Sequence, residues 1–134
     1  MARARKPLTP EDAFSRALKD RRQISIGVIG RRSGRAITLP VWFVLAEDAL
    51  WLLPVYGSQT QWYRNLLMNP AITIKTGGER LTLRSRTLKG AQAVRKVIRW
   101  FREKYTPEII ARLYPGPLNV AVKVSLRRRA GETT

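Results

Sequence analysis

The residues from Arg31 to Arg35 bring three guanidinium groups and one hydroxyl close together, and these groups could bind a phosphate. A guanidinium presents a planar fork of N–H donors that matches phosphate oxygens, and the free amides of a turn add further donors. Gly30 and Gly34 mark this stretch as a turn between two strands. The alternative is a solvated hairpin tip, because runs of charge are usually exposed.

A second stretch, residues 56–65, combines the end of a predicted strand with the start of a predicted helix. Gly57 ends the strand, and Ser58 followed three residues later by Gln61 matches a capping box. The first N–H groups of a helix are unpaired and carry partial positive charge. Such a helix start suits an anionic or carbonyl-rich ligand.

Aromatic side chains accompany this helix start. Tyr56, Trp62 and Tyr63 could present flat faces on which a ring stacks. The alternative is that Ser58 is an ordinary cap and that these aromatic residues belong to the hydrophobic core, which is their commonest location.

Two residue types that serve many active sites are absent, because the 134 residues include neither Cys nor His. Disulfides, thiol nucleophiles and Cys-ligated metals are therefore excluded, and the commonest general base and metal ligand are missing. With only nine Asp and Glu residues, a metal-dependent hydrolase is not expected and no metal site is predicted. If the chain is an enzyme, a bound cofactor would supply the chemistry.

The charge balance is strongly basic, with a formal net charge of +17. Such a field attracts nucleic acid, anionic lipid or phosphorylated ligands, although an arginine-rich surface also serves solubility alone. No apolar run reaches the ~18 residues of a membrane-spanning helix, and we expect a cytoplasmic location.

The elements that must position these residues follow from hydrophobic periodicity, caps and turns. We expect residues 1–8 to be a basic flexible arm, 9–126 a single domain, and 127–134 a basic flexible tail. The predicted strands are 24–28, 35–45, 49–56, 71–76, 79–88 and 118–126, and the predicted helices are 9–22, 58–68, 90–104 and 106–114. Short loops favour antiparallel pairing, and six strands favour a closed or nearly closed barrel without exposed edges. Pro40 predicts an edge position or a bulge.

Taken in order, these motifs resemble a known family. Gly30-Arg31-Arg32-Ser33-Gly34, then Pro40, then Trp62-Tyr63-Arg64-Asn65-Leu66 and Asn69-Pro70 resemble the deazaflavin (F420)-dependent nitroreductase and quinone reductase family. The resemblance extends over about residues 24–88. It implies the FMN-binding type of split barrel, mainly β with flanking helices (α+β), in which six antiparallel strands form the barrel.

The resemblance also implies an activity and a set of binding residues. Reduced coenzyme F420 would transfer hydride to a small-molecule electron acceptor, namely a quinone, nitro compound or enone. Tyr56 and Ser58 are candidates for supplying a proton. The implied cofactor-binding residues are Arg31, Arg32, Ser33 and Gly34 for the phosphate-bearing tail, and Tyr56, Gly57, Ser58, Gln59, Trp62 and Asn65 for the ring.

The sequence departs from the family pattern at two places in the expected pocket. Ile37 stands where many family members carry a basic residue, and the loop before Trp62 is short. FMN is therefore the second choice of cofactor, and other anionic ligands remain open. Tyr105 and Tyr114 are candidates for covering the ring.

Other functions and partners also follow from these patterns. A basic nucleic-acid-binding barrel is the main alternative, although no nucleic-acid-binding motif is present. A non-catalytic barrel that carries a cofactor or lipid is the third. The resemblance also allows a homodimer, and the basic arm could contact an anionic membrane.

Overall fold

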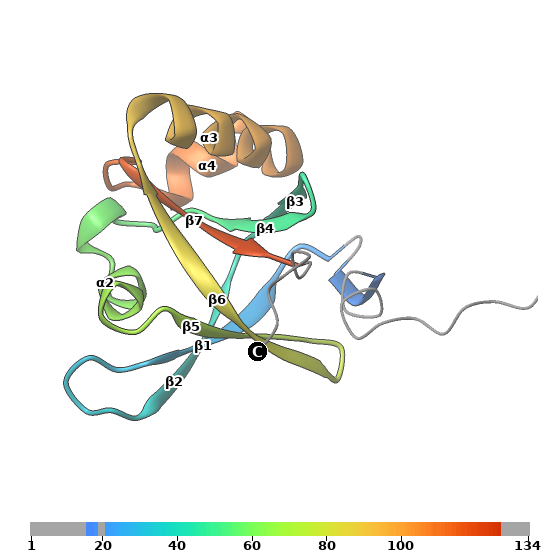
Figure 1. Cartoon of the computed structure of the whole chain (residues 1–134). Helices are drawn as coiled ribbons and strands as arrows, with labels where there is room; N and C mark the ends of the chain where they lie inside the picture. The colour runs from blue at the N-terminus through green and yellow to red at the C-terminus, as the bar shows by residue number, and fades with distance from the viewer. Residues whose placement is uncertain (1–15, 19–20, 127–134) are drawn as a thin grey trace, which may run out of the picture.

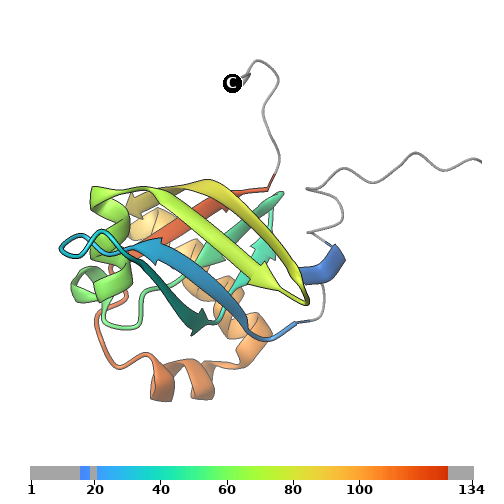
Figure 2. The same ribbon diagram turned by 90° about the horizontal axis from the view of Figure 1, so that it is seen from below.

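The computed structural model describes residues 16–18 and 21–126. It confirms a mainly antiparallel sheet that curls into a half-barrel with helices packed against it (Figure 1). The strand order is β2-β1-β5-β6-β7-β4-β3. Seen from below, β1, β2, β5 and β6 lie in front and the helices α3 and α4 lie away from them (Figure 2).

Most elements start and end close to their predicted positions. The strands are β1 (Ile24–Ile29), β2 (Ala36–Val41), β3 (Val44–Ala46), β4 (Ala49–Leu52), β5 (Ala71–Thr76), β6 (Glu79–Lys89) and β7 (Val120–Ser125). The helices are η1 (Gly57–Gln59), α2 (Gln61–Met68), α3 (Ala91–Tyr105) and α4 (Pro107–Leu113). Two predicted segments, the arm (1–8) and the tail (127–134), lie outside the described residues. Most of the helix predicted over residues 9–22 lies outside them as well, and its described residues 16–18 are helical.

The sheet has seven strands rather than the predicted six, because the strand predicted over residues 35–45 is two strands. β2 pairs with β1, whereas β3 pairs with β4. Between them the Tyr105 hydroxyl accepts from the Phe43 N–H at 3.1 Å and lies 2.9 Å from its carbonyl oxygen. Tyr105 thereby replaces the strand partners of Phe43, so the chain can leave one part of the sheet and join another.

Pro40 lies in an edge strand, as predicted, since β2 is the first strand in the sheet order. Strand β2 pairs with β1, which places Ile37 opposite Val28 and Leu39 opposite Ile26. β2 and β3 are the two edges of the sheet, so the barrel is open along one side.

Two hydrophobic cores lie on opposite faces of the curled sheet. The first fills the half-barrel, and Leu50, Leu52, Val122 and Val124 belong to it. The second lies between the sheet and α3 and α4, and includes Trp51 and Leu53 on β4 and after it, Ala121 on β7, and Val97, Phe101 and Tyr105 on α3. Strands β4 and β7 thus contribute alternate residues to both cores, as the period of two in a strand requires.

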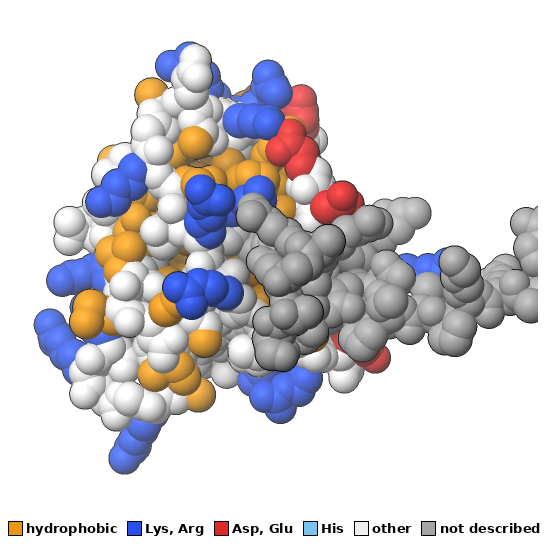
Figure 3. Space-filling model, in the orientation of Figure 1, with side chains coloured by type: hydrophobic (Ala, Val, Ile, Leu, Met, Phe, Trp, Pro, Cys, Tyr) orange, Lys and Arg blue, Asp and Glu red, His pale blue; other side chains and the backbone are white. Residues whose placement is uncertain are grey.

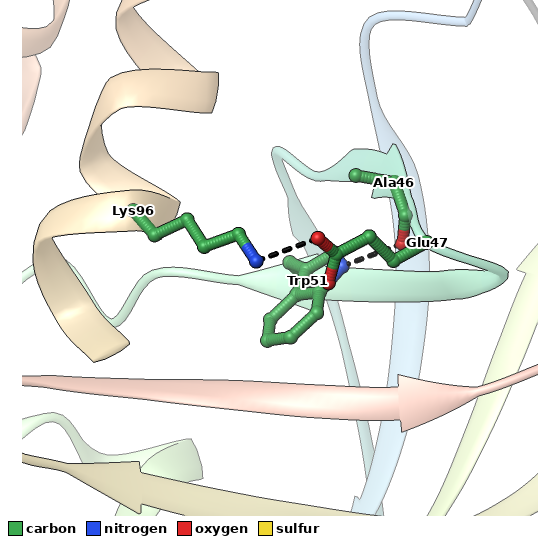
Figure 4. A network of polar contacts seen from close by, with 4 residues as sticks. All are labelled: Ala46, Glu47, Trp51 and Lys96. Carbon is green, nitrogen blue, oxygen red and sulfur yellow. Dashed lines mark hydrogen bonds and ion pairs between the residues drawn. The ribbon is translucent and has the colours of Figure 1, made fainter. Parts of the chain in front are cut away.

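One ion pair joins α3 to the β3–β4 hairpin, and one hydrogen bond lies within that hairpin (Figure 4). Lys96 of α3 forms an ion pair with Glu47 at 2.6 Å, and the Trp51 indole N–H donates to the Ala46 carbonyl at 2.8 Å. Both ion-pair side chains are about half exposed, so the ion pair adds little to the attachment of α3. Within the described ranges, no helix has the length and apolar character to cross a membrane.

Candidate functional site

A cavity of about 510 Å³ opens at the split side of the barrel. Its walls are the inner face of β2, the segment that follows β4, the first turns of α2 and the end of α4. Figure 2 shows these elements around one corner of the molecule, at the lower left. The lining residues are Gln23, Ile37, Leu39, Pro40, Val41, Trp42, Leu53, Val55, Tyr56, Thr60, Gln61, Trp62, Asn65, Leu113 and Tyr114.

One wall of the cavity is aliphatic because β2 alternates. Ile37, Leu39 and Val41 point to the same face, and this face continues the barrel core from the paired strand β1. A volume of this size and an apolar lining are typical of small-molecule sites.

Aromatic side chains from four segments form much of the remaining wall. Trp62 of α2 and Tyr114 after α4 are buried, while Tyr56 is 57% exposed at the opening. Trp42 lies against Tyr114, with ring centroids 6.2 Å apart and planes tilted by 50°. These faces offer stacking surfaces to a flat ring.

Arg31 joins the β1–β2 turn to α2 at the edge of this cavity. Its guanidinium donates from Nη1 to Asn65 Oδ1 and from Nη2 to Gln61 Oε1, both at 2.8 Å. The Arg31 backbone N–H donates to the same Asn65 oxygen at 3.1 Å. Asn65 is buried, so these bonds satisfy an otherwise costly polar group and fix the turn beside the helix.

The charge at this junction is positive. Partial desolvation, followed by the charges of Arg64 and Arg32, lowers the pKa of Arg31. Arg32 is exposed, and within the described ranges it forms no ion pair. The junction therefore presents cationic donors to an anion.

Ser33 and Gly34 shape the turn that carries these arginines. The Ser33 Oγ accepts from the Arg35 N–H at 3.1 Å, and Gly34 adopts a left-handed φ of 71°. The Gly34 N–H donates to the Gly30 carbonyl at 2.9 Å. Accepting this bond leaves the hydrogen of the Ser33 hydroxyl available as a donor.

Ser58 is not the N-cap of the helix predicted over residues 58–68, contrary to the sequence prediction. A short 3₁₀ turn, η1, contains Ser58, and α2 begins afterwards with Thr60 as its N-cap residue. The Ser58 N–H donates to Asn119 Oδ1 at 3.0 Å, and the Asn119 amide nitrogen lies 3.3 Å from the Ser58 hydroxyl. Both the N–H and the hydroxyl of Ser58 contact the Asn119 side chain. Ser58 does not line the cavity.

Thr60 is a buried residue of the site that sequence reasoning missed. Its hydroxyl accepts from the Tyr56 N–H at 2.8 Å, which closes the chain between β4 and α2. Gly57 and Gln59 lie in this closed segment but outside the cavity lining. A threonine two residues before an aromatic pair carries little signal by itself, whereas the alternating Ile37, Leu39 and Val41 could have been found from their period of two.

The two tyrosines considered for covering the ring have different places. Tyr114 lines the cavity, and its burial raises its pKa. Tyr105 lies behind the wall, where it stacks on Trp42 with ring centroids 4.3 Å apart. Burial raises the pKa of Tyr105 to about 12, so its hydroxyl stays protonated, and its one hydrogen lies between the Arg22 and Phe43 carbonyl oxygens, 2.7 and 2.9 Å away.

The curled sheet with flanking helices is the split-barrel fold seen in flavin-reductase-like proteins. Residues 10–108 match the F420H(2)-dependent quinone reductase family. The match extends over more than half of the chain, so the protein belongs to that family. Among curated proteins, none matches the chain.

Solved structures with low sequence identity share the fold of this chain. An F420-H2 dependent reductase (FDR-A) superposes with a TM-score of 0.61 at 20% identity, covering 78% of this chain and 94% of that one. A conserved hypothetical protein from Mycobacterium tuberculosis gives a TM-score of 0.68 at 16% identity, covering 90% and 82% of the two chains. The heme storage protein HutZ from Vibrio cholerae gives a TM-score of 0.65 at 18% identity, covering 91% and 93%.

Proposed function

We propose that this protein is an F420-dependent reductase that uses the cavity beside β2 to bring the reduced cofactor and an acceptor together. One observation carries the proposal: Arg31 binds Gln61 and Asn65, and so joins the basic turn to the aromatic wall of one cavity. Membership of the F420H(2)-dependent quinone reductase family supports the choice of cofactor.

The donor set of the site fits a flat ring with an anionic tail. We place the ring against Trp62 and Tyr56 and the phosphate-bearing tail at the turn, where Arg32, the Ser33 hydroxyl and the remaining Arg31 donors would hold it. Gly34 shapes this turn. Coenzyme F420, when bound, supplies the hydride.

The roles of the remaining site residues follow from their positions. Asn65 would act mainly by holding Arg31, since both groups meet at its carbonyl oxygen. Gly57, Ser58 and Gln59 would support the ring indirectly through the segment that Thr60 closes. Tyr56 is the better candidate proton donor, because it lines the cavity and Ser58 does not.

We propose a quinone as the acceptor, with nitro compounds and enones as further acceptors. The walls of the cavity are mostly apolar, and a planar apolar ring loses little on leaving water to enter them. Holding acceptor and cofactor in contact supplies much of the rate gain of such a transfer.

The test is binding of purified F420 and of FMN, measured separately by their ring fluorescence. We expect saturable F420 binding that Arg32→Gln weakens about tenfold, because one charge-assisted contact to phosphate contributes about 1.5 kcal/mol. Arg86→Gln is the matched control, since Arg86 is an exposed arginine on β6 that does not line the cavity. Binding of neither ligand would exclude this function, and tighter FMN binding would make FMN the cofactor.

The alternatives are separated by turnover and by salt. A carrier that is not an enzyme would bind F420 without oxidising it when a quinone is added. A nucleic-acid-binding protein would instead shift duplex or single strands with a steep dependence on salt.

We also propose that the chain forms a homodimer. One solved structure of similar fold is a domain-swapped dimer, with a TM-score of 0.62 at 22% identity and coverage of 78% of this chain and 81% of that one. Light scattering of the purified protein would measure the mass directly, and a monomer at all concentrations would refute the dimer.

A further inference from the structure

The opening of the cavity is apolar although the protein carries a formal net charge of +17. Three large apolar side chains that line the cavity are exposed, namely Ile37 at 42%, Tyr56 at 57% and Leu113 at 47%. They come from β2, the segment after β4 and α4, and we call them the apolar mouth. Exposed apolar groups gathered at one place mark an interaction surface more often than scattered ones do.

Basic side chains lie on α4, which carries part of the apolar mouth, and on the β1–β2 turn and α2, which adjoin the cavity. Arg31, Arg32 and Arg35 lie in the turn before β2, Arg64 lies on α2, and Arg112 precedes Leu113 on α4. On these same elements the described acidic side chains are limited to Glu108, at the start of α4. In Figure 3 basic side chains lie along the left margin, near α2 and the β1–β2 turn, and also over the rest of this face, while the acidic side chains in view lie on the right.

We propose that the apolar mouth is the surface by which this protein docks on an anionic phospholipid bilayer, so that an apolar acceptor passes from the lipid into the cavity. The proposal rests on the reductase function for the identity of the acceptor, but the docking itself needs only the surface. Apolar side chains would enter the interface while the arginines around them bind lipid phosphates.

Peripheral attachment needs two signals, which this surface combines. Apolar contact alone holds a protein weakly on a membrane, and basic residues near an anionic surface add attraction that falls off within a Debye length. A net charge of +17 provides long-range attraction toward such a surface.

A second copy of the chain fits the apolar mouth less well. Two-fold symmetry would place the same patch on both partners, so the arginines of each mouth would face those of the other. With so few acidic groups on these elements, that arrangement brings like charges together without compensation. A dimer that forms through another face leaves the mouth free.

The experiment is sedimentation of the full chain, without cofactor, with phosphatidylcholine vesicles that contain or lack phosphatidylglycerol. We expect binding to the anionic vesicles only. Leu113→Ser should lower the partition coefficient about tenfold, because the leucine then no longer leaves water, and Arg112→Gln about fivefold.

Leu67→Ser is the matched control. Leu67 is 50% exposed, similar to Leu113, but it lies on α2 outside the cavity lining. The Leu67→Ser variant should sediment with the anionic vesicles to the same extent as the unchanged protein. Equal binding by the Leu113 and Leu67 variants would overturn the proposal, because attachment would then come from charge elsewhere on the chain.

Two further results would also overturn it. One is no binding to either vesicle. The other is loss of dimer mass in Leu113→Ser with vesicle binding unchanged, since the mouth would then be a contact between copies. F420 binding in solution is measured separately. If the protein binds anionic vesicles but not F420, the proposed reductase function is refuted and the membrane-docking proposal stands.

Discussion

Gly57 shows how a single residue holds the wall of the cavity in place. Its φ of 60° lies in the left-handed region, and a Cβ there would meet the Pro117 carbonyl and the Asn119 side chain. The residue therefore has two reasons to be glycine, one conformational and one steric.

Comparing an alanine substitution at Gly57 with one at Gly34 should separate the cost of backbone strain from the cost of the steric clash. Gly57→Ala should lower the free energy of unfolding by about 3 kcal/mol, because backbone strain adds to a clash with rigid backbone. Gly34 has a φ of 71° but open space around it, so Gly34→Ala should cost only about 1 kcal/mol from strain alone. Urea unfolding measures both values, and equal losses would show that the contact with Pro117 has no energetic weight.

At the scale of elements, the break between β2 and β3 is the feature on which the cavity depends. It lets Trp42 join Val41 in the cavity lining while Val44 belongs to the second core. The Tyr105 hydroxyl holds both backbone groups of Phe43 and also donates toward the Arg22 carbonyl, at 2.7 Å.

Removing this hydroxyl should therefore loosen the sheet. Tyr105→Phe leaves a buried Phe43 N–H without its partner, and we expect a loss of about 2–3 kcal/mol in the free energy of unfolding. Tyr114→Phe is the control, since no hydrogen bond of its hydroxyl is found within the described ranges, and it should cost less than about 1 kcal/mol. Similar losses in thermal unfolding would contradict a special role for Tyr105.

Lys104 beside the same break gives a pH dependence. Its amino group lies 2.8 Å from the Phe43 carbonyl, and burial followed by the charge of Arg22 lowers its pKa from 10.5 to about 8. The unfolded chain then binds more protons than the folded one between these two values, so stability rises as the pH increases from 8 to 10.5.

Comparison with Lys104→Met isolates this contribution, because the ionisation of the tyrosines is common to both proteins. We expect the unfolding free energy of the unchanged protein to rise relative to the variant between pH 8 and pH 10.5. The size of the rise is reduced by solvent, since the side chain is only half-buried. A difference that stays flat with pH in urea unfolding would refute the lowered pKa.

The sequence predicts most elements, because the strands alternate and the helices begin after clear signals such as Thr106-Pro107. It does not predict the break at Phe43, since the hydroxyl that stabilises it comes from a residue 62 positions away. For the same reason, helix-capping rules, which consider only neighbouring residues, do not predict the hydrogen bond between Ser58 and Asn119, 61 positions away. The convergence of Arg31 and Asn65 was predicted only through the family resemblance, because spacing alone does not place a turn beside a helix.

At the scale of the whole molecule, β4 and β7 connect the two hydrophobic cores, because each strand contributes side chains to both. Leu52 packs in the half-barrel while Leu53 packs against the helices, and Val122 and Ala121 do the same on β7. Neither core can open without moving strands that the other core also needs.

We therefore expect a single cooperative unfolding transition in which both cores take part. Val122→Ala in the half-barrel and Val97→Ala in α3 should each cost roughly 1–3 kcal/mol and leave the transition two-state. Circular dichroism and tryptophan fluorescence should give coincident curves for all three proteins. Separate transitions in either variant would show that the helices unfold independently.

The open side of the barrel has a consequence for how copies of this protein behave at high concentration. An exposed strand edge normally invites cross-β stacking between molecules, because its free amides and carbonyls template a new strand. Here one edge carries Pro40, which has no amide hydrogen to offer, and the other edge, β3, is only three residues long. The cavity can stay open along this side without making the chain prone to fibril growth.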